Sequence, residues 1–123
     1  AALALAFYRE ALGALTVPYQ VLGFAKTINI INSNGAQQIA WITSMLPHLQ
    51  NSESLKRIAE LQAASTDVGN HVYVSCRCAI AHAFASPVVN PDSFADDRRL
   101  KQDLPLVREL AELVMMRELG LQR

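Results

Sequence analysis

Apolar residues recur every three or four positions along most of this chain, a period typical of α-helices rather than of strands. The pattern predicts a first helix over residues 2–15 and a second over residues 18–31. Thr16 offers an N-cap between them, and Pro18 suits a first helical turn. The polar residues 32–35 then interrupt the pattern. We therefore expect the fold to begin with two helices joined by a short turn.

Two further helices are expected in the middle of the chain. One covers residues 36–45 and ends before Pro47, because proline disfavours a helical conformation in the residue before it. The other begins at Asn51 or Ser52, which are both favourable N-cap residues. Leu55 and Ile58 lie on successive turns of this helix, so it should present an apolar face to the core.

The next segment, residues 68–83, is the most ambiguous part of the pattern. Its residues 72–74 are Val-Tyr-Val, which have high strand propensity. Thr66 and Asp67 nevertheless offer N-caps, and we predict a helix. The apolar row that supports this helix consists of Val68, Val72, Cys76, Ala79 and Ala83.

The end of the chain predicts one connection and one helix. Residues 86–103 are rich in Pro, Asn and Asp, contain the charge cluster at 96–99, and show no period, so we expect an irregular connection. A last helix should run from about Pro105 to Leu119 and close at Gly120. The prediction is one all-α domain over residues 1–123, a bundle of four or five helices.

Composition narrows the functional class. About half of the residues are hydrophobic (51%) and 18% are charged, which excludes a disordered chain. The 11 basic and 11 acidic residues give a formal net charge of zero, whereas proteins that coat nucleic acids carry a basic excess. An enzyme that contacts only one or two phosphates stays compatible with this balance.

The first residues and the two cysteines indicate the cellular compartment that we expect for this chain. Residues 1–5 are apolar but lack the basic region of a secretory leader, and no run is long enough to span a membrane. Cys76 and Cys78 are too close together in the sequence for a disulfide between them to stabilise a fold, so we expect a reducing cytoplasm. Because the chain begins at Ala1 inside a helical pattern, we expect a domain truncated at its N-terminus, with a further portion upstream.

The candidate chemistry lies in residues 77–83, RCAIAHA, where Arg77 and His82 interrupt an apolar run. Arginine is always charged, and histidine titrates near neutral pH. On a helix the two side chains point about 140° apart, so they do not share one face. Without further context the simpler interpretation is structural, with Arg77 paired to Asp67 or Asp103 and His82 bonded to a backbone carbonyl.

An Arg, four to six residues and a His, late in a small helical domain, resemble the HEPN superfamily. The likeness extends over most of the chain. Residues 7–11 (FYREA) and 18–24 (PYQVLGF) resemble the first two helices of a HEPN subgroup of ApeA-like or methylamine-utilisation accessory proteins. Residues 90–92 (NPD) and 103–106 (DLPL) resemble the end of the same subgroup. The resemblance implies a HEPN-like helical bundle.

The resemblance also implies metal-independent RNA cleavage, with Arg77 and His82 as catalytic residues. The RNA 2′-hydroxyl attacks the adjacent phosphate, a guanidinium stabilises the charge on the phosphoryl oxygens, and an imidazole moves or orients the proton. HEPN domains commonly pair so that two motifs face one cleft. The implied partners are therefore a second copy of the chain and RNA, with an antitoxin or an upstream domain as further partners, and no cofactor is required.

One residue departs from the HEPN pattern. The residue after the motif arginine is commonly polar in active members, whereas here it is Cys78, whose thiol is a weak hydrogen-bonding group. Two alternatives to the enzyme therefore stay open. The first is a non-catalytic module that binds RNA or a nucleotide or mediates dimerisation, and the second is a helical domain in which the motif is purely structural.

Other side chains are candidates for substrate binding. Tyr73, one turn before Arg77, either contacts a phosphate or base or packs in the core, and Cys78 is assigned to the same site. Arg98 and Arg99, with Lys101, form a basic cluster that either contacts the RNA backbone or pairs with its acidic neighbours.

A zinc site is the competing chemistry. The four residues that carry nitrogen or sulfur ligands lie on one predicted helix and do not converge tetrahedrally, so we expect no metal. They are His71, Cys76, Cys78 and His82.

Overall fold

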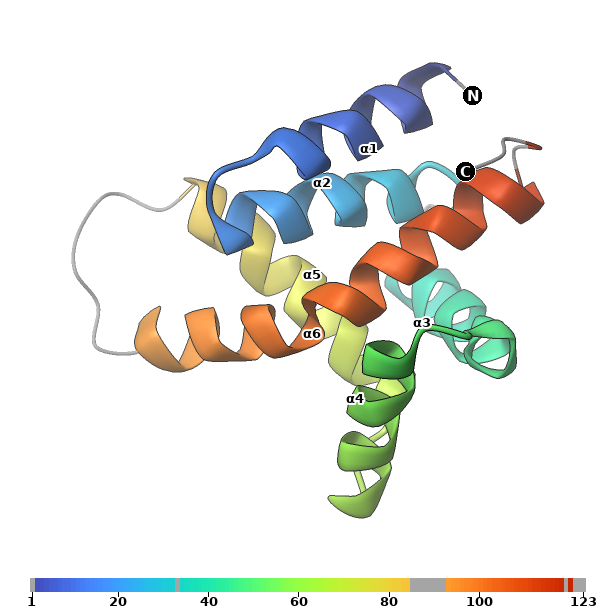
Figure 1. The fold of residues 1–123 in the computed structure, drawn as a ribbon, viewed down its shortest axis with the longest axis vertical. Helices are drawn as coiled ribbons and strands as arrows, with labels where there is room; N and C mark the ends of the chain where they lie inside the picture. Colours follow the sequence, from blue (N-terminus) through green and yellow to red (C-terminus); the bar gives the residue numbers. More distant parts are fainter. Residues whose placement is uncertain (1, 33, 85–92, 119, 121–123) are drawn as a thin grey trace.

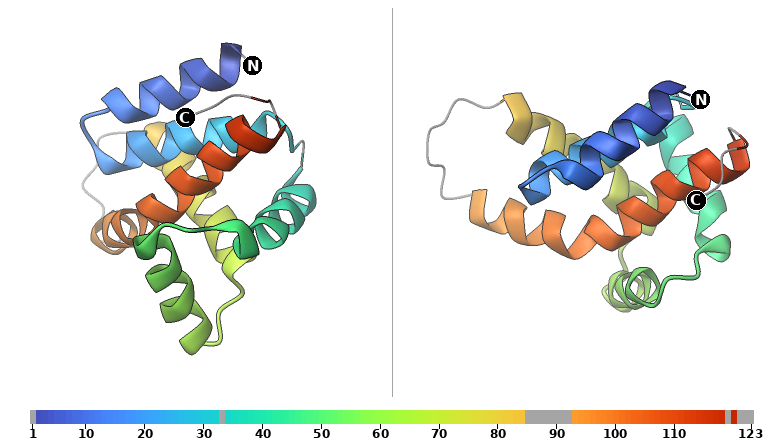
Figure 2. Two further views of the ribbon diagram at one scale, coloured as in Figure 1. Left: turned by 45° about the vertical axis from the view of Figure 1, so that its right-hand side comes forward. Right: turned by 45° about the horizontal axis from the view of Figure 1, so that its top comes forward.

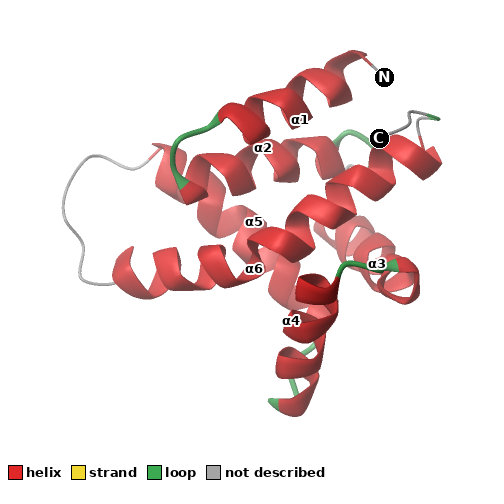
Figure 3. Cartoon of the chain, viewed as in Figure 1, coloured by secondary structure: helices red, strands yellow, loops and turns green. Residues whose placement is uncertain are grey.

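The structure is a computed structural model that describes residues 2–32, 34–84, 93–118 and 120. This part of the chain contains six α-helices and no strand (Figure 3), which confirms the all-α prediction. The number exceeds the four or five given for the bundle and equals the number of helical segments predicted one by one along the sequence. None of its helices is long and apolar enough to cross a membrane. The helices are α1 (Ala2–Gly13), α2 (Val17–Asn29), α3 (Gly35–Met45), α4 (Ser52–Ala63), α5 (Val68–Phe84) and α6 (Ser93–Leu113).

Helices α1 and α2 form an antiparallel hairpin at one edge of the molecule (Figure 1). Their axes approach closely at Ala11 and Gly23, where a Cβ on Gly23 would lie only 2.5 Å from the Ala11 Cβ. Pro18 lies in the first turn of α2, as predicted, while Thr16 occupies the N-cap position without a side-chain capping bond. Glycine at position 23 therefore sets how closely α1 can pack on α2.

The core lies where α2, α5 and α6 cross, with α3 and α4 packed around the crossing (Figure 2). Large side chains from all three crossing helices are completely or almost completely buried there, which is the main source of stability in a domain of this size. The contributing side chains include Val21, Phe24 and Ile28 of α2, Val72 of α5, and Leu106 and Leu110 of α6.

Polar residues at the helix starts explain where several helices begin. The Asn34 side chain accepts a hydrogen bond from the backbone N–H of Gln37, and Asn51 accepts one from Glu53. The Asp67 carboxylate accepts one from the N–H of Asn70. Each bond satisfies an otherwise unpaired amide of a first helical turn. The predicted starts of α4 and α5 are therefore confirmed.

The predicted irregular connection is wrong for residues 93–103, because α6 begins at Ser93 and continues through Pro105. Proline removes one backbone hydrogen bond and tends to kink a helix, and Figure 1 shows α6 changing direction along its length. Tertiary packing outweighs this local cost, since Leu100 and Asp103 are both fully buried on one face of the helix. The Pro105 carbonyl also accepts a hydrogen bond from Ser54 of α4.

Candidate functional site

Helix α5 carries most of the residues that the sequence singles out. The predicted helix is confirmed, and Val68, Val72 and Cys76 of its apolar row are buried. Ala79 and Ala83 lie in the same helix, but their side chains are outside the described part of the structure. The ambiguous Val-Tyr-Val run is helical because its first valine faces the core at the spacing of the apolar row.

Arg77 lies on the exposed face of α5. Its guanidinium carbon is 5.9 Å from the centre of the Tyr73 ring, one turn earlier, at a distance that permits a cation–π contact. The two carboxylates considered as its structural partners are engaged elsewhere, since Asp67 caps α5 and Asp103 binds other side chains. No carboxylate among the described side chains forms an ion pair with Arg77.

Tyr73 is half-buried between α5 and the start of α3. Its hydroxyl lies so close to Gly35 that a Cβ there would come within 2.6 Å of it. The tyrosine therefore packs with its tip against α3 while a face of its ring adjoins the Arg77 guanidinium. This placement limits the freedom of Tyr73 and supports the position of the arginine.

The structure leaves the remaining motif residues untested. Cys78 and His82 belong to α5, but their side chains lie outside the described part of the structure. Helical geometry alone places His82 about 140° around the axis from Arg77. Arg98 is exposed on α6 rather than in a loop.

The polar cluster around Asp103 is one that no sequence motif indicates. It joins three helices, and the Asp103 side chain is fully buried at its centre. The Nε of Arg57 donates to Asp103 Oδ1 at 2.7 Å, and the Nε2 of His71 lies 2.8 Å from Oδ2. The Ser75 hydroxyl donates to the same Oδ2 atom. The Asp103 cluster consists of Arg57 of α4, His71 and Ser75 of α5, and Arg99 and Asp103 of α6.

Arg99 closes the Asp103 cluster from the side of α6. Its Nε donates to Ser75 Oγ at 2.8 Å, and its NH2 group donates to the backbone oxygen of His71 at 2.9 Å. The same NH2 group lies 3.3 Å from His71 Nδ1. Arg99, expected to contact RNA or pair with acidic neighbours, is therefore occupied to a large extent within the protein.

The shorter contact of Nε2 with Asp103, 2.8 Å against 3.4 Å to the Arg57 NH2 group, favours one arrangement of the protons on His71. A guanidinium only donates hydrogen bonds, so the Nδ1 atom that faces Arg99 is best placed to accept with its lone pair. Nε2 then carries the hydrogen and donates it to Asp103. The imidazole in this arrangement is neutral.

Burial is the largest effect on the pKa of His71 and lowers it below the ordinary value of 6.5. Asp103 acts in the opposite direction, whereas the positive charges of Arg99 and Arg57 lower the pKa further. Burial and the negative charge of Asp103 raise the pKa of the neighbouring Cys76 thiol to about 12. Both groups are therefore uncharged at neutral pH.

The described side chains contain no group of three His, Cys, Asp or Glu residues able to hold a metal ion. His71 is engaged with Asp103 and Arg99, and Cys76 is buried with a protonated thiol. Of the four candidate zinc ligands, these two are thus committed to hydrogen bonding and packing, while the side chains of Cys78 and His82 lie outside the described part of the structure.

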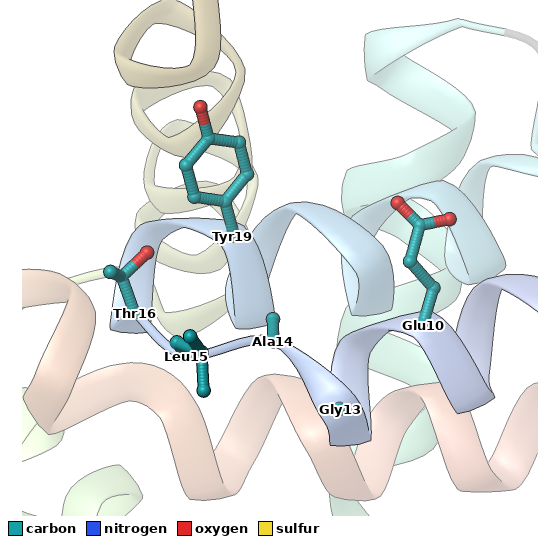
Figure 4. A pocket seen from close by; sticks show the side chains of 6 residues that line it. All are labelled: Glu10, Gly13, Ala14, Leu15, Thr16 and Tyr19. Carbon is teal, nitrogen blue, oxygen red and sulfur yellow. The ribbon is translucent and has the colours of Figure 1, made fainter.

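Two hollows on the described surface differ in character. The first, of about 490 Å³, lies at the turn between α1 and α2 and is largely apolar (Figure 4). The second, of about 320 Å³, lies between α4 and α6 and includes Arg57 of the Asp103 cluster. Neither hollow includes Arg77. The first is lined by Glu10, Gly13, Ala14, Leu15, Thr16 and Tyr19, and the second by Glu53, Lys56, Arg57, Glu60, Gln102 and Pro105.

Once the structure is known, the spacing of four of these residues in the sequence is seen to fit the Asp103 cluster. His71 and Ser75 are four residues apart, as are Arg99 and Asp103, so each pair shares one face of its helix. That the two faces meet depends on the packing of α5 on α6, which local sequence does not show. Arg57 lies 46 residues from Asp103 and gives no sequence signal at all.

Comparison with known proteins gives one match. The family model described as methylamine utilization protein MauJ matches residues 4–116 and therefore covers most of the chain. The matched range includes all of α5 and the Asp103 cluster. Comparisons with curated proteins and with solved structures found no match.

Proposed function

The chain belongs to the methylamine utilization protein MauJ family, and we propose that it acts in methylamine utilization as an accessory, HEPN-type domain directed at RNA. The family membership agrees with the subgroup that the sequence resembles. The activity we assign is metal-independent cleavage of single-stranded RNA. Arg77 binds the phosphate, His82 accepts and donates the proton, and a second copy of the chain completes the site.

The exposed guanidinium of Arg77 is the observation that carries this proposal. Among the described side chains, it contacts the ring of Tyr73 and forms no ion pair with a carboxylate. A planar guanidinium can donate two parallel hydrogen bonds to phosphate oxygens, so an exposed arginine is suited to binding a phosphate of an RNA backbone. Other arginines of the described structure are paired with carboxylates, among them Arg57, Arg99 and Arg108.

The reaction needs only a guanidinium and an imidazole. The 2′-oxygen forms a bond to phosphorus while the bond from phosphorus to the 5′-oxygen breaks, leaving a cyclic phosphate and a 5′-hydroxyl. The proton lost by the 2′-hydroxyl is balanced by the proton gained at the leaving oxygen, and an imidazole is suited to both transfers. The guanidinium stabilises the added negative charge on the phosphoryl oxygens.

Helix geometry supports a site shared between two copies. Arg77 and His82 project about 140° apart, so one α5 helix does not offer both to the same phosphate. In a symmetric dimer, each copy presents the same surface to the other. Arg77 of one copy and the partner subunit's His82 then act on one phosphate.

The proposal is tested by incubating labelled single-stranded RNA with the protein and a metal chelator. We expect cyclic-phosphate products, and we expect Arg77→Ala to lower the rate on the order of 100-fold or more, since it removes a donor to the developing charge. Arg9→Ala is the matched control, because Arg9 is also exposed but lies on α1. Cleavage by Arg77→Ala at the wild-type rate would contradict the proposal.

A non-catalytic RNA-binding module is the second candidate. Cys78 stands where active HEPN members carry a polar residue, and Arg99 is occupied inside the Asp103 cluster. This candidate predicts RNA binding without product formation, weakened by Arg77→Ala and unaffected by His82→Ala. Fluorescence anisotropy with labelled RNA, run beside the cleavage assay, separates the two functions.

A further inference from the structure

The Asp103 cluster links α4 to α5, two helices that share few other contacts. Helix α4 projects from the rest of the bundle (Figure 1) and packs mainly on α6. Arg57 extends from α4 to Asp103 of α6 and comes within 3.4 Å of His71 Nε2 on α5. Arg57 therefore supplies a polar link from α4 to α5, beside the apolar packing of Ile58 and Leu61 in the core.

A proton on His71 conflicts with the geometry of the cluster. Protonated Nδ1 would carry a hydrogen pointing at the Arg99 NH2 group, which also only donates. The imidazolium would be a third cation around a single carboxylate, next to Arg57 and Arg99. The side chains of Arg57 and His71 are each only 13% exposed, so water screens this repulsion weakly.

Among the described side chains, charges on the other neighbours of α5 do not offset this repulsion. Helix α3 carries no ionisable residue, and Lys26, the one charged residue of α2, pairs with Glu10 of α1. On α4, Glu60 accepts from Arg57 at 3.2 Å and so favours movement of that guanidinium away from Asp103. On α6, Arg99 and Asp103 contact the imidazole among the side chains that the structure describes.

We propose that the Asp103 cluster is a proton-sensitive latch, which holds α4 against α5 and α6 while His71 is neutral and releases α4 when His71 is protonated. Arg57 moves with Glu60 into the hollow between α4 and α6, which these two residues already line. The latch is a property of the fold and does not depend on RNA cleavage.

The direction of the pH effect follows from the lowered pKa of His71. A free histidine binds a proton more readily than His71 does in the latched structure. The open and unfolded states therefore bind more protons than the latched state. The latch is fully stabilised above about pH 6.5, the ordinary histidine pKa, and its stability decreases as the pH falls below that value.

Hydrogen exchange of individual helices tests the latch in the wild-type chain at about pH 7.5 and about pH 5.5, a range in which histidine changes its charge. After correction for intrinsic exchange rates, we expect α4 to lose protection at the lower pH while α2 keeps its own. Equal protection of α4 at both pH values would overturn the proposal.

His71→Gln supplies the decisive variant, because its amide can donate to Asp103 and accept from Arg99 without titrating. We expect α4 in this variant to stay protected at both pH values. His48→Gln, which alters a histidine on a 3₁₀ turn outside the cluster, should respond to acid as the wild type does. Acid release of α4 in the glutamine variant of His71 would contradict the latch.

Should His71→Gln fail to fold, the wild-type protein still decides the question. The His71 ring resonances then report its titration by NMR. A titration of the ring that coincides with the loss of α4 protection supports the latch. Opening of α4 without titration of His71 rejects it.

Discussion

Asp103 is the residue on which the polar contacts between α4, α5 and α6 converge. Its buried carboxylate accepts from Arg57, His71 and Ser75, and Arg99 lies 3.9 Å away. A buried carboxylate of this kind is tolerated because each oxygen has hydrogen-bond donors and the surrounding cations balance the charge. The contacts also orient His71 and Ser75 on α5.

Asp103→Ala should destabilise the protein by about 3–5 kcal/mol, because the change leaves Arg57 and Arg99 close together without a carboxylate. Urea unfolding followed by circular dichroism measures the free energy of unfolding. Glu10→Ala removes a surface ion pair with Lys26 and should cost less than about 1 kcal/mol. Equal costs for the two substitutions would show that the Asp103 cluster does not stabilise the fold.

At this scale the sequence identified single residues better than their partners. The sequence singles out Arg77, which is exposed, but offers Asp103 only as one of its ion-pair partners. Arg57 binds Asp103 instead, and that pairing depends on a tertiary contact between α4 and α6. No periodic pattern within one helix contains this information.

Among the elements, the α1–α2 hairpin shows how a small residue determines packing. A Cβ at position 23 would overlap both the Cβ and the Cα of Ala11, and the Ala11 backbone cannot move independently of α1. Gly13, near the end of α1, has no atom within 4 Å of the corresponding position. The two glycines therefore offer a direct test of helix contact.

Gly23→Ala should lower the free energy of unfolding by about 1–3 kcal/mol, because overpacking forces α1 and α2 apart. Gly13→Ala should leave it unchanged or raise it by up to about 1 kcal/mol through better helix propensity. Thermal unfolding of both variants measures the difference. A stability gain in Gly23→Ala would contradict the close packing of α1 on α2.

Helix positions were largely predictable, and the start of α6 was the main exception. Pro18, Asn51 and Asp67 marked helix starts through local chemistry that operates independently of the rest of the fold. Pro105 suggested a start by the same logic, yet α6 passes through it. Burial of Leu100 and Asp103 decides that case, and burial depends on the packing of distant helices.

For the whole molecule, the placement of Arg77 has the largest functional consequence. The crossing of α2, α5 and α6 buries one face of α5 and leaves Arg77 on the other. An exposed arginine there suits contact with an RNA phosphate, and the wide angle between Arg77 and His82 favours a site shared by two copies. The proposed activity is therefore a property of the dimer.

The most direct test of this account mixes two inactive variants, Arg77→Ala and His82→Ala, under conditions that allow subunits to exchange. In a mixed dimer of a shared site, one site contains both wild-type residues and the other contains neither. Half of the dimers are mixed and half of their sites are intact, so RNA cleavage should return to about one quarter of the wild-type rate. Cleavage no greater than that of the separate variants would contradict the shared site.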